Sequence, residues 1–113
     1  MGKLLQIRVS AWTFSEDEVE KTWPRLWKLI WEDGDAIPKK GVMELAQAAF
    51  DAVRAGLLPE EQAKKMREKA DQAEDLRLKL ETALADRNPK EADALSYRLE
   101  DCLDELEDIA SNF

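Results

Sequence analysis

The feature that most constrains the fold of this 113-residue chain is a pair of long helical patterns in its C-terminal half, separated only by Asp86-Arg87-Asn88. In the second pattern, apolar residues recur at alternating spacings of three and four, as in the a/d seam of a coiled coil. These residues are Ala92, Leu95, Leu99, Cys102, Leu106, Ile109 and Phe113. The first pattern offers a matching series: Ala63, Met66, Ala70, Ala73, Leu76, Leu80 and Ala83 or Leu84. A connection this short predicts an antiparallel helical hairpin over residues 59–113.

Two prolines mark where the helices of this hairpin should begin. Pro59 and Pro89 occupy positions suited to a first helical turn, where the missing amide donor costs nothing. At a rise of 1.5 Å per residue, the helix from Pro59 to Asp86 would be roughly 40 Å long, which exceeds the width of a compact domain of this size. Part of the hairpin should therefore project, or be covered by another chain.

The N-terminal end of the chain has a different periodicity. Leu5, Ile7 and Val9 alternate with polar residues, which predicts a half-buried β-strand from about Lys3 to Phe14. No second run of this kind occurs in the sequence. The predicted strand therefore has no visible companion within its own chain.

A helix rich in tryptophan should follow this strand. Ser15 and Glu18 match the Ser-x-x-Glu capping box, so we expect the helix to begin there and to end near Asp33. Pro24 lies inside this helix and removes one amide donor. We predict a kink at the proline, with a restart capped by Thr22 as the alternative.

A short helix should lead into the hairpin, because apolar residues recur at helical spacing over residues 42–53 until Gly56 stops the pattern. The predicted fold is thus mainly α: one N-terminal strand, a kinked helix, a short helix and a long antiparallel hairpin. We expect a single domain over residues 1–113, with the strand and two helices in residues 1–58 and the hairpin in 59–113. Hydrophobic residues at 44% and charged residues at 37% suit exposed amphipathic helices around one core.

Composition excludes much of the common enzyme chemistry. The chain contains no histidine, so it has no Ser-His or Cys-His pair, no imidazole base and no histidine ligand for zinc. Phosphate-binding loops and nucleophile elbows are also missing from the sequence. Carboxylates three residues apart, such as Glu105 and Asp108, suit Mg²⁺, but acidic pairs at this spacing are also typical of a solvated helix face. We favour the solvated face, and predict no catalytic residue, no metal ligand and no cofactor.

The formal charge of -8 is concentrated near the C-terminus. A candidate acidic surface consists of Glu100, Asp101, Asp104, Glu105, Glu107 and Asp108. Such a surface should repel nucleic acid, whose ligands need basic patches.

The single cysteine, Cys102, cannot form an internal disulfide, and no apolar stretch is long enough to span a bilayer. We therefore expect a cytoplasmic protein that binds neither membranes nor nucleic acid directly.

Trp23, Trp27 and Trp31 repeat every four residues and place an aromatic stripe on one side of the predicted kinked helix. The favoured interpretation is core packing, because an amphipathic helix must bury its apolar face. A partner surface is the second interpretation, since tryptophan is enriched at interface hot spots, and a small-molecule pocket is the third. Trp12 could join either surface.

The lone predicted strand leads to the most specific expectation, which concerns the oligomeric state. Its edges would leave backbone amides and carbonyls unsatisfied, so we predict pairing with the same segment of a second copy about a twofold axis. Pairing with a different protein and an unpaired extended arm are the alternatives. The candidate interface residues are Leu5, Ile7, Val9, Trp12, Trp23, Trp27 and Trp31.

The sequence thus predicts a non-catalytic helical protein-protein interaction module, homodimeric through its N-terminal strand. One alternative is an acidic protein that imitates nucleic acid and inhibits another protein through the Glu100–Asp108 cluster. A Mg²⁺-dependent phosphohydrolase that uses the same carboxylates is a third hypothesis.

Overall fold

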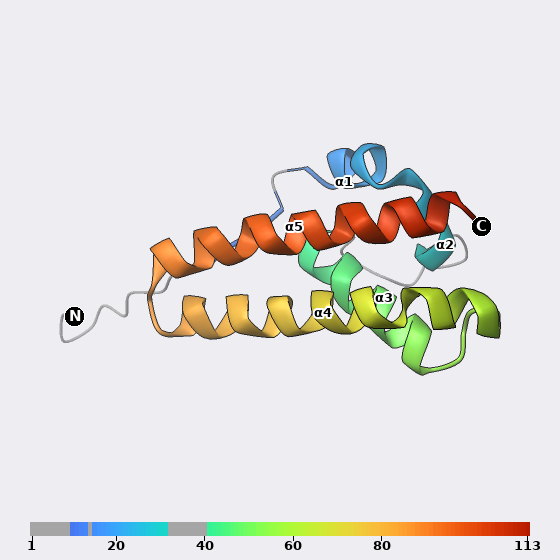
Figure 1. The fold of residues 1–113 in the computed structure, drawn as a ribbon. Coiled ribbons are helices and arrows are strands. Elements are labelled where there is room, and N and C mark those ends of the chain that lie inside the picture. The colour runs from blue at the N-terminus through green and yellow to red at the C-terminus, as the bar shows by residue number, and fades with distance from the viewer. Residues whose placement is uncertain (1–9, 14, 32–40) are drawn as a thin grey trace, which may run out of the picture.

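The computed structural model describes residues 10–13, 15–31 and 41–113, and the fold over these residues is mainly helical, as predicted (Figure 1). The helices are α1 (Glu16–Thr22), α2 (Pro24–Trp31), α3 (Val42–Arg54), α4 (Glu60–Ala85) and α5 (Pro89–Ser111). Helices α4 and α5 form the predicted antiparallel hairpin. Helix α3 packs against α4, and α2 packs against α5 and α3. The turn end of the hairpin extends beyond α1, α2 and α3 in Figure 1, so part of it projects past these helices.

The turn between α4 and α5 is closed by its own residues. Arg87 has a φ of 57°, and its amide donates to the Leu84 carbonyl (3.1 Å). The amide of Asn88 reaches back to the Ala83 carbonyl (2.9 Å), which completes a Schellman motif. Asn88 then caps α5, because its side-chain oxygen accepts from the Glu91 amide (3.2 Å), and Pro89 is the first helical residue as predicted.

The predicted seam is largely confirmed. Every predicted core residue of α4 is buried, with Ala83 inside and Leu84 half-buried. On α5 the first five predicted seam residues are buried, but Ile109 is only partly buried and Phe113 is 41% exposed. The prediction for Phe113 is wrong because α5 ends at Ser111, so the helical periodicity no longer applies to it. Leu103 and Ala110 are buried as well, since α5 packs against α2 and needs a wider apolar stripe than a two-helix seam.

The single kinked helix is wrong, because the structure has two separate helices that are interrupted at Trp23. This residue has φ −126° and ψ 60°, outside the helical region. The cause is the ring of Pro24, which disfavours the helical conformation of the preceding residue. Thr22 does not cap the second helix either; it is the last residue of α1, and its hydroxyl donates to the Glu18 carbonyl (2.7 Å).

The ends of the remaining helices follow the sequence signals only in part. Ser15 is the N-cap residue of α1 as predicted, but its side chain makes no capping hydrogen bond, so the capping box is wrong. The predicted end near Asp33 lies outside the described residues. Helix α3 matches its prediction. Gly56 follows it with a φ of +70°, and the Leu57 amide donates to the Ala52 carbonyl (3.1 Å) at the C-terminal end of the helix. Pro59 precedes α4 rather than starting it.

The predicted N-terminal strand falls mostly outside the described residues, which include none of Leu5, Ile7 or Val9. Residues 10–13 are described, and no strand is assigned to them. The paired strand therefore stays a prediction.

Candidate functional site

The segment of residues 10–13 is fixed to the start of α3 by a long-range hydrogen bond. Gly41 is the N-cap residue of α3 and has no side chain with which to cap the helix. The hydroxyl oxygen of Thr13 accepts from the Val42 amide instead (2.9 Å). A Cβ atom at Gly41 would overlap with Thr13 Oγ1 and with Glu44 Oε1, so only glycine permits this close approach. The contact determines where the neighbouring Trp12 lies.

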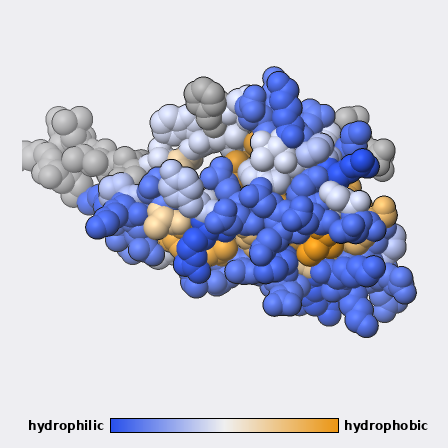
Figure 2. Space-filling model, turned by 45° about the horizontal axis from the view of Figure 1, so that its top comes forward, coloured by the Kyte–Doolittle hydropathy of each residue, from blue (hydrophilic) through white to orange (hydrophobic). Residues whose placement is uncertain are grey.

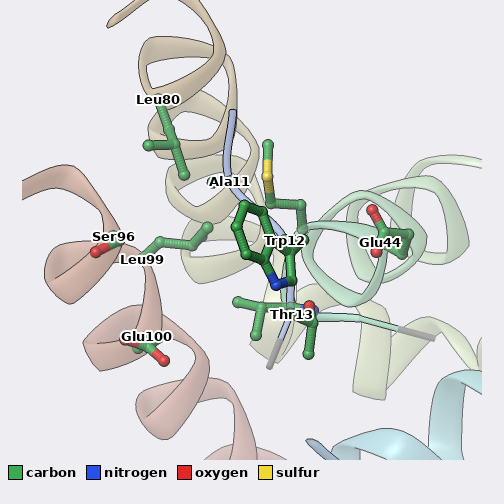
Figure 3. A pocket seen from close by; sticks show the side chains of 10 residues that line it. Ala11, Trp12, Thr13, Glu44, Leu80, Ser96, Leu99 and Glu100 are labelled. Carbon is green, nitrogen blue, oxygen red and sulfur yellow. The ribbon is translucent and has the colours of Figure 1, made fainter. Parts of the chain in front are cut away.

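Trp12 stands over a groove between α3, α4 and α5, which we call the Trp12 groove (Figure 3). Its volume is about 340 Å³. The lining residues are Ala11, Trp12, Thr13, Val42, Met43, Glu44, Leu80, Ser96, Leu99 and Glu100. Trp12 is 82% exposed, although it is a large and mostly apolar side chain. The structure thus presents an indole ring at the surface above a hollow.

The groove combines an apolar floor with acidic walls. Leu80 of α4 and Leu99 of α5 are both buried in the core, and they line the floor of the groove. Figure 3 shows Glu44 and Glu100 on either side of the Trp12 ring in this view, one from α3 and the other from α5. A ligand that suits this arrangement needs apolar atoms for the floor and positive charge for the walls.

The carboxyl group of Glu100 is in an electrostatically unfavourable position. Partial burial raises its pKa above the ordinary value, and the nearby charges of Asp104 and Asp101 raise it further. Within residues 10–13, 15–31 and 41–113, the structure gives this carboxylate no ion pair and no hydrogen bond. A cation that entered the groove would supply an opposite charge and so favour the ionised carboxylate.

Two other residues of the predicted acidic surface hold α2 in place. Asp104 accepts a hydrogen bond from the Trp23 indole nitrogen (2.8 Å). Glu107 accepts from the backbone amides of Leu26 (2.8 Å) and Arg25 (3.2 Å), the first two amides of α2 after Pro24. The carboxylate of Glu107 therefore caps a helix that begins about eighty residues earlier in the sequence.

The other residues of the acidic surface differ in their contacts. Glu105 forms an ion pair with Lys69 of α4 (2.9 Å), and the hydrogen bond in this pair raises the pKa of Lys69. Asp101 and Asp108 are exposed. The six acids are thus not one uniform surface: three have partners within the chain, and Glu100 faces the groove. Figure 2 shows that hydrophilic residues dominate the surface in this view, with apolar residues in limited areas between them.

The tryptophan stripe belongs mainly to the core, which was the favoured interpretation. Trp23 and Trp31 are buried and are therefore not accessible at the surface of this chain. Trp27 is half-buried and packs edge-to-face on Trp31, with ring centroids 6.0 Å apart and an interplanar angle of 84°. Of the four tryptophans, Trp12 alone is largely exposed in the described part of the chain.

Cys102 is a structural residue, as its place in the seam predicted. It is buried, and its thiol donates to the Lys69 carbonyl (3.3 Å) between α5 and α4. Burial raises the pKa of this thiol to about 11, and the charge of Glu105 adds to the effect.

Sequence reasoning identified Trp12 and Glu100 as candidates, but it missed Thr13, Gly41 and Glu44. Leu80 and Leu99 were assigned to the seam, and their contribution to a groove had no signal in the sequence. No local pattern could have found the groove, because its lining comes from four separate segments of the chain.

The described residues contain no group of three or more Cys, Asp or Glu side chains arranged to hold a metal ion. None of their helices has both the length and the apolar character needed to cross a membrane. Comparisons with protein-family models, with curated proteins and with solved structures return no significant match.

Proposed function

We propose that this chain is a non-catalytic protein-interaction module and that its partner binds at the Trp12 groove. The observation that carries the proposal is Trp12, 82% exposed above a hollow whose floor is apolar. Tryptophan is the residue most typical of interface hot spots, and it contributes most when a partner removes it from water. The Thr13 and Gly41 contact supports the proposal, because it holds the indole at a defined place instead of leaving it on a loose arm.

The hydroxyl groups that line the groove favour binding over catalysis. Ser96 Oγ donates to the Asp93 carbonyl (2.6 Å), and Thr13 Oγ1 accepts from the Val42 amide (2.9 Å). Both hydroxyls are therefore engaged with backbone groups, and the chain has no histidine to activate either of them. What the groove offers a ligand is apolar area, an aromatic face and negative charge.

The uses of the acidic residues weaken the hypothesis of a nucleic-acid mimic. Such a mimic needs a field of free carboxylates, whereas Asp104, Glu105 and Glu107 are bonded to Trp23, to Lys69 and to the start of α2. The homodimer through Leu5, Ile7 and Val9 stays a separate prediction. Sedimentation equilibrium tests it, and a strict monomer would remove it.

Quantitative affinity capture from a native lysate tests the interaction module. Wild-type protein should retain at least one partner that Trp12→Ala loses, with a loss of about 2 kcal/mol of binding free energy, or roughly thirtyfold in Kd. The matched control is Tyr97→Ala, which removes another exposed aromatic side chain, 64% exposed on α5 and outside the groove lining. Equal retention by wild type, Trp12→Ala and Tyr97→Ala would reject the proposal.

A further inference from the structure

We infer that the Trp12 groove recognises a basic side chain, arginine or lysine, that a partner protein presents beside apolar residues. This inference rests on the proposed function and adds the chemistry of the partner. It is carried by the joint placement of an exposed indole, an apolar floor and two carboxylates on different helices.

The floor suits the aliphatic part of a long basic side chain. The buried side chains of Leu80 and Leu99 line the bottom of the groove, and Val42 and Met43 are half-buried beside them. Arginine and lysine cover apolar surface with three or four methylene groups while their charged ends remain near polar groups. A volume of about 340 Å³ accommodates one such side chain with an apolar neighbour.

The charged end would meet favourable groups from three directions. The face of the Trp12 indole attracts cations through its quadrupole, and tryptophan is the strongest of the aromatic residues in this respect. Glu44 reaches the groove from α3 and Glu100 from α5. Asp101 and Asp104, whose charges act on Glu100, strengthen the negative potential on the α5 side.

Glu100 distinguishes this groove from an ordinary apolar hollow. A half-buried carboxylate without a cation destabilises the fold, and the raised pKa of Glu100 reflects that cost. Locally unfavourable residues of this kind are typical of functional sites. An incoming guanidinium or ammonium group would supply the missing counter-charge, whereas an anionic ligand would add to the repulsion.

Two small probes of equal shape test the inference directly. Hexylguanidinium carries an apolar chain and a guanidinium group, and hexylurea replaces that group with a neutral one. We expect hexylguanidinium to cause saturable shifts of the Trp12 indole and of the Leu80 and Leu99 methyl groups in NMR spectra. Hexylurea should bind about tenfold more weakly, because it lacks the charge that Glu100 and Trp12 recognise.

Two variants test whether hexylguanidinium binding depends on the charge of Glu100. Glu100→Gln keeps the shape of the side chain and should weaken hexylguanidinium binding by about fivefold to tenfold, which is typical of a lost charge-assisted contact. Asp108→Asn removes the same charge from an exposed position of α5 outside the groove and should leave binding unchanged. Dispersed spectra of both variants confirm that they fold.

Three results would overturn the inference: equal binding of the two probes, shifts confined to residues outside the groove, or equal losses in Glu100→Gln and Asp108→Asn. These results are distinguishable from failure of the proposed function. If the probes fail while capture of a partner still depends on Trp12, only the basic-side-chain inference is wrong. If capture does not depend on Trp12, the proposal that the partner binds at the Trp12 groove is wrong whatever the probes do.

Discussion

The hairpin and the two helices packed on it, α2 and α3, satisfy their helix ends in different ways. The hairpin uses its nearest neighbours in sequence: Arg87 and Asn88 close the end of α4, and the Asn88 side chain caps α5. The N-terminal ends of α2 and α3 instead depend on distant groups, Glu107 for α2 and Thr13 for α3. The turn of the hairpin is therefore closed by neighbouring residues, whereas the N-terminal ends of α2 and α3 are capped only through the tertiary structure.

This difference predicts that α2 is sensitive to the loss of its tertiary contacts. Pro24 has no amide hydrogen, and the first turn of α2 contains no acidic residue to favour its N-terminus. The next two amides would be left without acceptors if Glu107 did not accept from both. We expect α2 to lose its structure whenever it separates from α5, whereas the turn between α4 and α5 would keep its own hydrogen bonds.

The largest expected effect tests whether the hairpin depends on its own internal contacts. Arg77 is buried on α4 and binds Glu74 and Glu81 of the same helix, the latter at 2.8 Å. Arg77→Met should leave Glu74 buried without its cation and reduce the free energy of unfolding by about 3 kcal/mol, measured by urea denaturation. The double variant Glu74→Met, Arg77→Met should recover most of this loss. If Arg77→Met alone is as stable as wild type, solvent screens the ion pair between Arg77 and Glu74.

An intermediate effect tests the dependence of α2 on the hairpin. Glu107→Ala removes the acceptor for two α2 amides and should cost about 1–2 kcal/mol, in the range of a lost N-cap. Hydrogen exchange should become faster at Leu26 and along α2, while the buried amides of α4 and α5 keep their protection. Asp108→Ala, which alters the next residue in sequence, is the control and should change little. Uniform loss of protection across all helices would contradict the comparison.

The smallest expected effect concerns the turn of the hairpin. Arg87 adopts a φ of 57°, a conformation that glycine tolerates better than any residue with a Cβ atom. Arg87→Gly and Arg87→Ala both remove the side chain, so their difference isolates the backbone. Thermal unfolding should show the glycine variant to be more stable by about 0.5–1 kcal/mol. Equal stability would mean that the turn relaxes out of the left-handed conformation.

The sequence predicted the hairpin well because its signals are local. Asn88 and Pro89 lie at the start of the helix that they define, and the apolar residues of α4 and α5 repeat with the helical period over many turns. The break at Trp23 was mispredicted because two local rules compete at Pro24, and the effect of the ring on the preceding residue prevailed over continuation of the helix. The groove could be predicted only as isolated candidates, because Trp12, Glu44 and Glu100 meet only after folding.

By itself, the sequence determined where the long helices lie, which of their faces is apolar and that they must run antiparallel, since periodicity and turn residues act over a few residues. Only the tertiary structure decided which carboxylates become helix caps or ion pairs and which one faces the groove. The six acids near the C-terminus are chemically alike in sequence, and their roles differ only through their neighbours: Trp23 for Asp104, Lys69 for Glu105 and the first amides of α2 for Glu107. Contacts between residues so distant in sequence leave no local pattern, because they depend on how whole helices pack.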